Sequence, residues 1–235
     1  MSEATKICLS DFTLDALTAY LVSLGQPKFR AKQIFKWLHQ KLVTDFSQMT
    51  DQPKTLLAQL AENCTIAAPT IRRRQQSKDG TVKDLRQWAD GNCIETVLMR
   101  YKYGNTVCVS TQVGCAMGCR FGASTQAGRV RDLTAGEIAS EIYTAQKDSG
   151  ERVSHIVLMG IGEPLHNFNN VMDFLEIISC PEGVNIGIRN ISLSTCGLVP
   201  KIDELAKRHL QLTLSVSLHA PDNVTRSGMM PVNDA

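Results

Sequence analysis

The spacing of apolar residues predicts three amphipathic helices in the first quarter of the chain. Leucines recur at helical spacing over residues 13–24, and Gly25 stands where a C-terminal cap is expected. Over residues 29–39 apolar side chains recur at i, i+3, i+4 and i+7, with basic residues on the other faces. Pro53 marks the start of a third helix. Together these segments predict a small helical module.

The pattern changes after residue 68. Short, partly alternating segments around residues 83–88 and 94–99 flank an Asp-Gly-Asn turn, which is typical of joined strands. After residue 104, short apolar segments alternate with longer amphipathic ones in a β-α-β-α-β-α-β order, which requires a parallel sheet. The strands are expected at 107–111, 156–159, 191–195 and 212–218, and the helices at 134–147, 168–178 and 200–208.

This pattern predicts an α/β fold with two parts. Residues 1–103 form an N-terminal accessory module of helices and strands, and residues 104–235 form an incomplete parallel barrel that stops after about the fourth strand. An uncovered last strand is a liability in a native sheet. We therefore expect the 235 residues to be a C-terminally truncated part of a longer protein.

Composition and charge narrow the function classes. The chain is 43% apolar and contains neither a run long enough to cross a bilayer nor a secretory signal, so we expect a cytoplasmic monomer with no membrane partner. Residues 1–105 carry 15 Lys and Arg against 10 Asp and Glu, whereas residues 106–235 carry 10 against 13. The basic half, with three consecutive arginines at 72–74, favours contact with phosphate, although a solvated loop explains the triplet equally well.

Eight cysteines are present, and three of them lie close together in sequence. In a cytoplasmic chain of this size, Cys108, Cys115 and Cys119 indicate metal or redox chemistry rather than disulfides. The other five are expected to be small core residues. Cys115 and Cys119 belong to a Val-Gly-Cys-Ala-Met-Gly-Cys-Arg-Phe-Gly segment directly after a predicted strand, where parallel α/β folds bind ligands.

The C-x3-C-x-Phe arrangement of this segment resembles the cluster loop of radical S-adenosylmethionine (SAM) enzymes. Four further motifs follow the later strands, and one lies near the front: Met159–Pro164, Leu193–Gly197, Ser217–Pro221, Met230–Asn233 and Phe29–Phe35. In this order and spacing the set resembles the RlmN/Cfr family of RNA adenine-C2 methyltransferases, RlmN branch. The resemblance runs from about residue 10 to the end of the chain.

The resemblance implies a radical-SAM partial (β/α)6 barrel with two cofactors, a [4Fe-4S] cluster and SAM. It implies methylation of an adenine C2 in 23S rRNA and in tRNA, with an external electron donor. By the same resemblance Cys115 and Cys119 bind the cluster, Glu95 accepts a proton, and Cys108 resolves a protein–RNA adduct. The SAM contacts carried over are Gly162, Glu163, Ser194, Ser217, Leu218 and His219.

Each of these residues has a simpler explanation when taken alone. Cys108 in a strand is typical of a core residue, His219 of a strand-end histidine, and Glu95 of a surface strand position. Gly160-x-Gly162 lacks the third glycine of a dinucleotide fingerprint. Only the combined motifs favour the catalytic interpretation.

The sequence departs from the family pattern in two places. Gly122 occupies the position of the third cluster cysteine. Cys196 could replace it as a ligand, but we expect Cys196 to be a packed residue at a strand end instead. The cysteine that the family methylates near its C-terminus is absent, so we do not expect this chain to complete the reaction. Two other functions stay open: a non-catalytic RNA-binding remnant, and a zinc site at Cys108, Cys115 and Cys119, which is disfavoured because paired ligand sets are missing.

Overall fold

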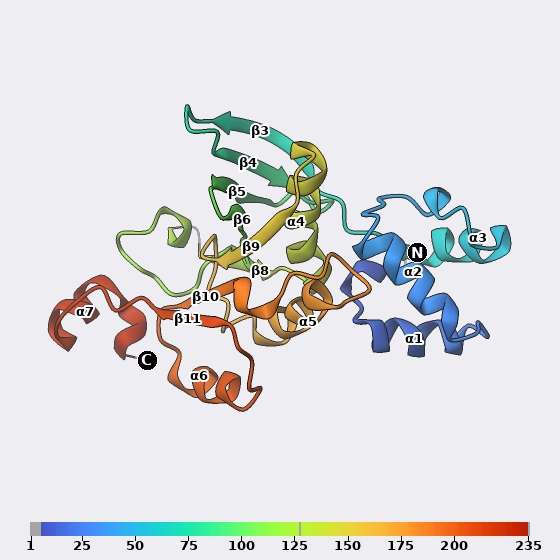
Figure 1. Ribbon diagram of the computed structural model, residues 1–235. Coiled ribbons are helices and arrows are strands. Elements are labelled where there is room, and N and C mark those ends of the chain that lie inside the picture. The colour runs from blue at the N-terminus through green and yellow to red at the C-terminus, as the bar shows by residue number, and fades with distance from the viewer. Residues whose placement is uncertain (1–5, 127, 235) are drawn as a thin grey trace.

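A mixed sheet forms the centre of the protein in the computed structural model, which describes residues 6–126 and 128–234 (Figure 1). Its strand order is β11-β10-β9-β6-β5-β4-β3. The strands are β3 Thr70–Gln76, β4 Val82–Gln87, β5 Cys93–Tyr101, β6 Gly104–Cys108, β9 Val153–Leu158, β10 Ile191–Thr195 and β11 Thr213–Val216. β6, β9, β10 and β11 pair in parallel, and β3 to β6 pair antiparallel, which confirms the α/β class.

Three helices connect the parallel strands where the sequence predicts them. They are α4 Ala135–Ser149, α5 Phe168–Ser179 and α6 Val199–Ala206. α4 begins at a capping box in which Thr134 and Glu137 satisfy each other's backbone N–H groups, as predicted, and it ends at Gly150 with φ 68°.

Three predicted strands of the parallel half differ in their bounds. β9 begins at Val153, three residues before the predicted start. β6 ends at Cys108 rather than at residue 111, because the chain beyond it leaves the ladder and Thr111 N–H donates to the Ile161 carbonyl of the following loop. β11 ends at Val216, three residues before His219, rather than at residue 218, and the φ of His219 is 60°. The strand ends thus turn early into the loops that build the site.

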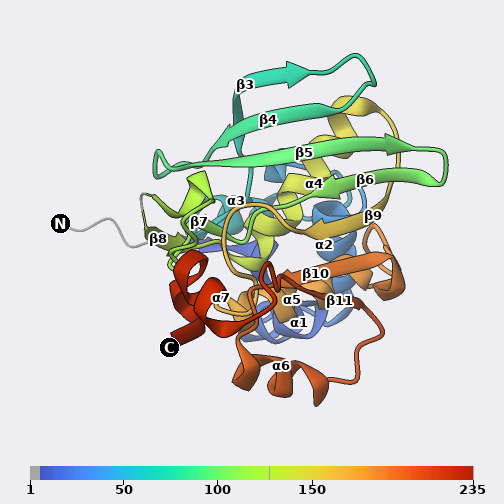
Figure 2. The same cartoon turned by 90° about the vertical axis from the view of Figure 1, so that its left-hand side faces the viewer.

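The two faces of the sheet differ in chemistry. Val107, Ile156, Leu158 and Leu193 alternate onto one face, where α4 and α5 bury them in the core. The other face lies uncovered in the described part of the chain, as Figure 2 shows from the front. Register places Cys108, Val157, Ser192 and Thr213 together on that second face. Small side chains, most of them polar, therefore line this uncovered face of the sheet.

The N-terminal helices pack behind the sheet. α1 Leu14–Ser23, α2 Phe29–His39 and α3 Lys54–Asn63 confirm the predicted helical module, joined by the short parallel pair β1 Ile7–Cys8 and β2 Cys64–Thr65. The Tyr143 hydroxyl on α4 lies 2.8 Å from His39 Nδ1, and Gly136 N–H donates to Asp11 Oδ1 at 2.9 Å. These contacts attach the module to α4.

Smaller elements complete the described chain. β7 Gln112–Gly114 pairs antiparallel with β8 Arg129–Asp132, and α7 Asn223–Met229 follows β11. Short 3-10 helices lie at Leu9–Asp11, Phe46–Gln48, Ala123–Thr125, Ile188–Asn190 and Pro231–Asp234.

The division into residues 1–103 and 104–235 stays a prediction about domains. Hydrogen bonds of the central sheet cross it, because β5 and β6 form a hairpin that turns at this point. Within residues 6–126 and 128–234, no helix is both long and apolar enough to span a bilayer.

Candidate functional site

A cavity of about 370 Å³ lies at the carboxyl ends of the parallel strands, between the segment after β7 and the loops after β9, β10 and β11. Its volume falls within the usual range for small-molecule sites. The sequence-predicted residues that line it are Cys115, Cys119, Gly122, Gly162, Glu163, Ser194, Ser217 and His219. Segments more than 100 residues apart thus converge on one site.

Cys115 and Cys119 occupy one wall of this cavity. Cys115 is only 7% exposed, and its N–H donates to the Gly128 carbonyl across the β7–β8 pair. Burial raises the pKa of both thiols, and the Arg226 charge partly offsets this for the pKa of Cys119. Both groups therefore carry a proton at neutral pH until a metal or another electrophile displaces it.

A three-thiolate cluster site is incomplete here. Gly122 lines the same cavity but has no side chain, and within residues 6–126 and 128–234 no three His, Cys, Asp or Glu side chains are arranged to hold a metal ion. The donor set therefore does not fit a [4Fe-4S] cluster, nor the zinc site considered from the sequence.

Cys196 does not replace the missing ligand in this arrangement. Its N–H donates to Glu163 Oε2 at 2.8 Å, and the thiol itself is buried. Burial and the neighbouring Glu163 carboxylate raise the pKa of the Cys196 thiol well above its ordinary value. Such a group is a packed thiol rather than a ready thiolate.

Glu163 holds the loop after β9 in place. Its Oε1 accepts the Leu165 N–H at 3.0 Å, and its own N–H donates to Gln112 Oε1 at 2.9 Å. Gln112 in turn donates to Asp132 Oδ1 at 2.7 Å, which ties this loop to the β7–β8 pair. Glu163 is only 3% exposed, and its carboxylate accepts hydrogen bonds from backbone N–H groups.

Gly162 makes this loop geometry possible, and its replacement by alanine is expected to disrupt the loop. Its φ is 105°, and an added β-carbon would lie 2.6 Å from the Gln112 β-carbon. We expect Gly162→Ala to cost about 2 to 3 kcal/mol of unfolding free energy, measured by denaturant titration. Gly122→Ala is the matched control, because Gly122 has φ −99° and an added β-carbon there would make only ordinary contacts; an equal loss in both variants would contradict the argument.

The other predicted SAM contacts divide into two groups. The Ser194 and Ser217 hydroxyls lie 3.3 Å apart and face the cavity, and His219 lies against the Phe121 ring with centroids 5.0 Å apart. Leu218 does not line the cavity, and the residue is 61% exposed.

Glu95 and Cys108 lie outside the cavity but on the same uncovered face of the sheet. Cys108 pairs with Val97, so Glu95, two residues before Val97, shares its face. Glu95 forms an ion pair of 3.0 Å with Lys83. Burial, with a smaller effect of Glu141, raises the pKa of Cys108 to about 11, so this thiol is protonated at neutral pH.

Three residues that the sequence did not single out shape the site. Gln112 and Asn167 are buried and tie backbone segments together, and the Arg226 guanidinium binds the carbonyls of Cys196 and Leu218. Gln112 is adjacent to the cluster segment, which is the one signal that would have pointed to it. Asn167 and Arg226 have no comparable sequence signal.

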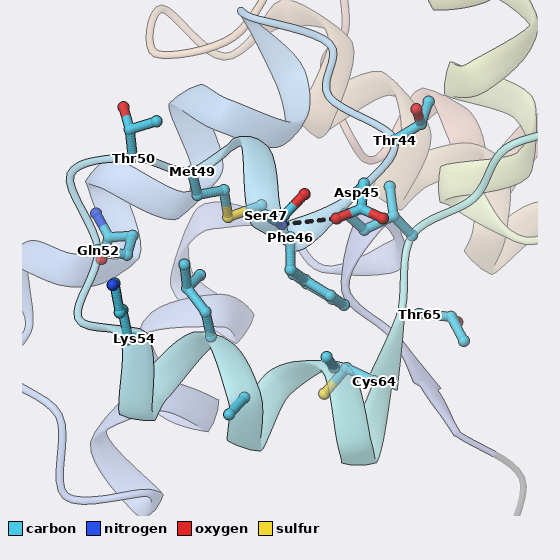
Figure 3. A pocket seen from close by; sticks show the side chains of 14 residues that line it. Thr44, Asp45, Phe46, Ser47, Met49, Thr50, Gln52, Lys54, Cys64 and Thr65 are labelled. Carbon is cyan, nitrogen blue, oxygen red and sulfur yellow. Dashed lines mark hydrogen bonds between the residues drawn. The ribbon is translucent and has the colours of Figure 1, made fainter.

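A larger cavity, about 840 Å³, lies in the N-terminal module between α3 and the 44–52 segment (Figure 3). Phe46, Met49 and Leu57 are among its lining residues, and it contains none of the predicted site residues. The predicted site residues that line a cavity therefore lie around the smaller one.

Comparisons with known proteins agree with the positions of these motifs. Residues 7–66 match the family model of the ribosomal RNA large subunit methyltransferase N-terminal domain, and residues 109–233 match that of the radical SAM superfamily. Among solved structures, a radical SAM methyltransferase from Sphaerobacter thermophilus is similar, with a TM-score of 0.91 and 44% identity over 97% of this chain and 68% of that one.

Curated relatives are named probable dual-specificity RNA methyltransferase RlmN. The protein of Clostridium perfringens strain 13 is 54% identical, and that of Clostridium botulinum strain Eklund 17B is 53% identical. Each alignment covers 94% of this chain and 64% of the relative. The chain therefore spans just under two thirds of the length of these relatives.

Proposed function

This chain belongs to the radical SAM superfamily and has an RlmN-type N-terminal domain, and from this we propose that it is the RNA-binding and SAM-binding part of an RNA methyltransferase. We propose adenine C2 of 23S rRNA and tRNA as the target of the whole enzyme, with an external electron donor. The single observation that carries the proposal is the convergence of the cluster segment with the Gly162–Glu163, Ser194 and Ser217 loops on one cavity.

The polar groups around the cavity are suited to SAM. The hydroxyls of Ser194 and Ser217 and the ring of His219 offer hydrogen bonds to an amino acid and a ribose. SAM supplies the methyl group when bound. The hydrogen bond between Glu163 and Gln112 fixes the loop after β9 at the SAM site. The adjoining sheet face carries Glu95 and Cys108, and a target base would lie there.

Because the donor set does not fit the cluster, a non-catalytic RNA-binding function is the second candidate. Gly122 is the observation that favours it. Binding of labelled SAM, measured by equilibrium dialysis, separates the two. Saturable binding that Ser194→Ala with Ser217→Ala weakens supports the methyltransferase scaffold, and RNA binding without SAM binding supports the alternative.

Two arginines of β3 are the candidate phosphate contacts. Arg72 and Arg73 are exposed, whereas Arg74 is paired with Asp84 at 2.8 Å and Asp148 at 2.7 Å. On α2, Lys32 and Lys36 both pair with Glu182. The arginine triplet and the basic helix are thus partly used for internal ion pairs.

We expect Arg72→Gln with Arg73→Gln to weaken binding of a tRNA stem-loop several-fold in low salt. Each lost phosphate contact should reduce the slope of log K against log salt by about one. Fluorescence anisotropy at several salt concentrations measures this. Lys207→Gln, an exposed cation beside α6, is the control. An unchanged slope in the double variant would place the RNA elsewhere on the protein.

A further inference from the structure

Glu141 on α4 is a fully buried carboxyl group that the proposed reaction does not use. It occupies the apolar face of the helix, at i+3 from Ile138 and i−4 from Ala145, where a helix of this kind normally carries an apolar side chain. A buried carboxyl group is costly unless hydrogen bonds compensate it. Its presence therefore calls for an explanation from its contacts.

The carboxyl group of Glu141 receives hydrogen bonds from strand β5 and from the segment just beyond β6. The Ser110 N–H lies 3.2 Å from both of its oxygens, and the Thr96 hydroxyl on β5 bonds to Oε2. The buried Arg86 guanidinium donates to the Glu141 main-chain carbonyl and to Asp84. Glu141 thus binds the segment just beyond β6 from beneath the sheet.

Ser110 extends this attachment to two functional segments. Its hydroxyl donates to the Glu95 carbonyl at 2.7 Å and accepts the Ile161 N–H at 3.1 Å. Ser110 is fully buried, so no water competes for these bonds. Ile161 immediately precedes Gly162 and Glu163. One hydroxyl therefore connects the strand of the predicted proton acceptor with the loop of the predicted SAM contacts.

We propose that Glu141 and Ser110 are positioning residues that hold the Glu95 strand and the Gly162–Glu163 loop in fixed relation. Glu141 orients Ser110, and Ser110 sets the separation of the two segments. The proposal rests on the proposed function for its catalytic meaning, but the coupling between the two segments is a property of this chain alone.

The charge state of Glu141 suits this role. Burial raises its pKa to about 8, against the opposing effects of Thr96, Arg86 and Ser110, so the group is largely neutral at pH 7. The charged and titratable groups that act on it or are acted on by it are Arg86, Glu137 and Cys108, and Arg86 is in turn influenced by Asp84 and Asp148. A neutral carboxyl group is matched in shape by glutamine, which keeps one acceptor oxygen for the Ser110 N–H.

Amide hydrogen exchange of the chain as it exists tests the coupling. In Ser110→Ala the Ile161 amide loses its acceptor and should exchange about tenfold faster. In Glu141→Met the Ser110 hydroxyl remains, yet the Ile161 amide should also exchange faster, because Ser110 is no longer oriented. Glu141→Gln should restore slow exchange, and Glu176→Gln on the exposed face of α5 is the control.

SAM affinity provides a second readout. We expect Glu141→Met to weaken it about tenfold and Glu141→Gln to leave it within twofold, with exchange in β10 unchanged as proof of folding. An Ile161 amide that stays protected in Glu141→Met would overturn the proposal, as would a glutamine variant as perturbed as the methionine one. If the unmodified chain binds no SAM, the proposed function fails, whereas the exchange result still decides the coupling.

Discussion

Gly122→Cys is expected to turn a chain that assembles no four-iron cluster into one that binds about four iron atoms per chain after anaerobic reconstitution. The reason is local. Gly122 lines the same cavity as Cys115 and Cys119, and its backbone is extended, with φ −99° and ψ 121°. A β-carbon there would meet its nearest neighbours, Cys119 O and Thr125 Cγ2, at 3.7 Å, an ordinary contact distance. A cysteine therefore fits without backbone change.

Cluster assembly is measured by the iron and sulfide content and by visible absorption. Gly122→Ser is the control, because serine has the size of cysteine but lacks the thiol. Reductive cleavage of SAM in the cysteine variant alone would identify position 122 as the sole defect of the cluster segment. A four-iron cluster in the unmodified chain would contradict our account of the donor set. A Cys196→Ala variant would then show whether Cys196 supplies the third thiolate.

Acidification is expected to destabilise the protein through His39. This histidine is the last residue of α2 and is fully buried against α4, and burial lowers its pKa from 6.5 to about 3. The unfolded chain takes up a proton below pH 6.5 that the folded one refuses, so stability is lost as pH falls. Between pH 6.5 and about pH 4.5 the loss is about 2 kcal/mol. Comparison with His39→Gln isolates the contribution of His39 to this loss, because the two proteins share every other titrating group.

Denaturant titrations of both proteins over this pH range give the difference directly. The unmodified protein should lose stability relative to His39→Gln as pH falls, whatever the offset between them at pH 7. A constant difference would mean that His39 titrates normally. NMR titration of the His39 ring, expected to stay neutral to about pH 4, decides the point if the glutamine variant does not fold.

The sequence alone predicted most of the main elements in order and type, but not β3, whose arginine triplet it treated as a loop or a phosphate-binding surface. Helix 29–39 was predicted at the bounds that the structure shows, and the Thr134–Glu137 capping box marked the start of α4. These signals are local: apolar side chains repeat at helical spacing, and a cap acts within one turn. The cluster segment could likewise be identified from the sequence, because its cysteines are close together in the chain.

Only the tertiary structure decided which of the predicted residues share a site. It placed Ser194, Ser217 and Glu163 around one cavity, turned Leu218 outward, and put Glu95 and Cys108 on the neighbouring sheet face. The sequence analysis did not single out Glu141, and its partners Thr96 and Ser110 lie 45 and 31 residues away. Hydrogen bonds between segments so distant depend on strand register and helix packing, which local patterns do not encode.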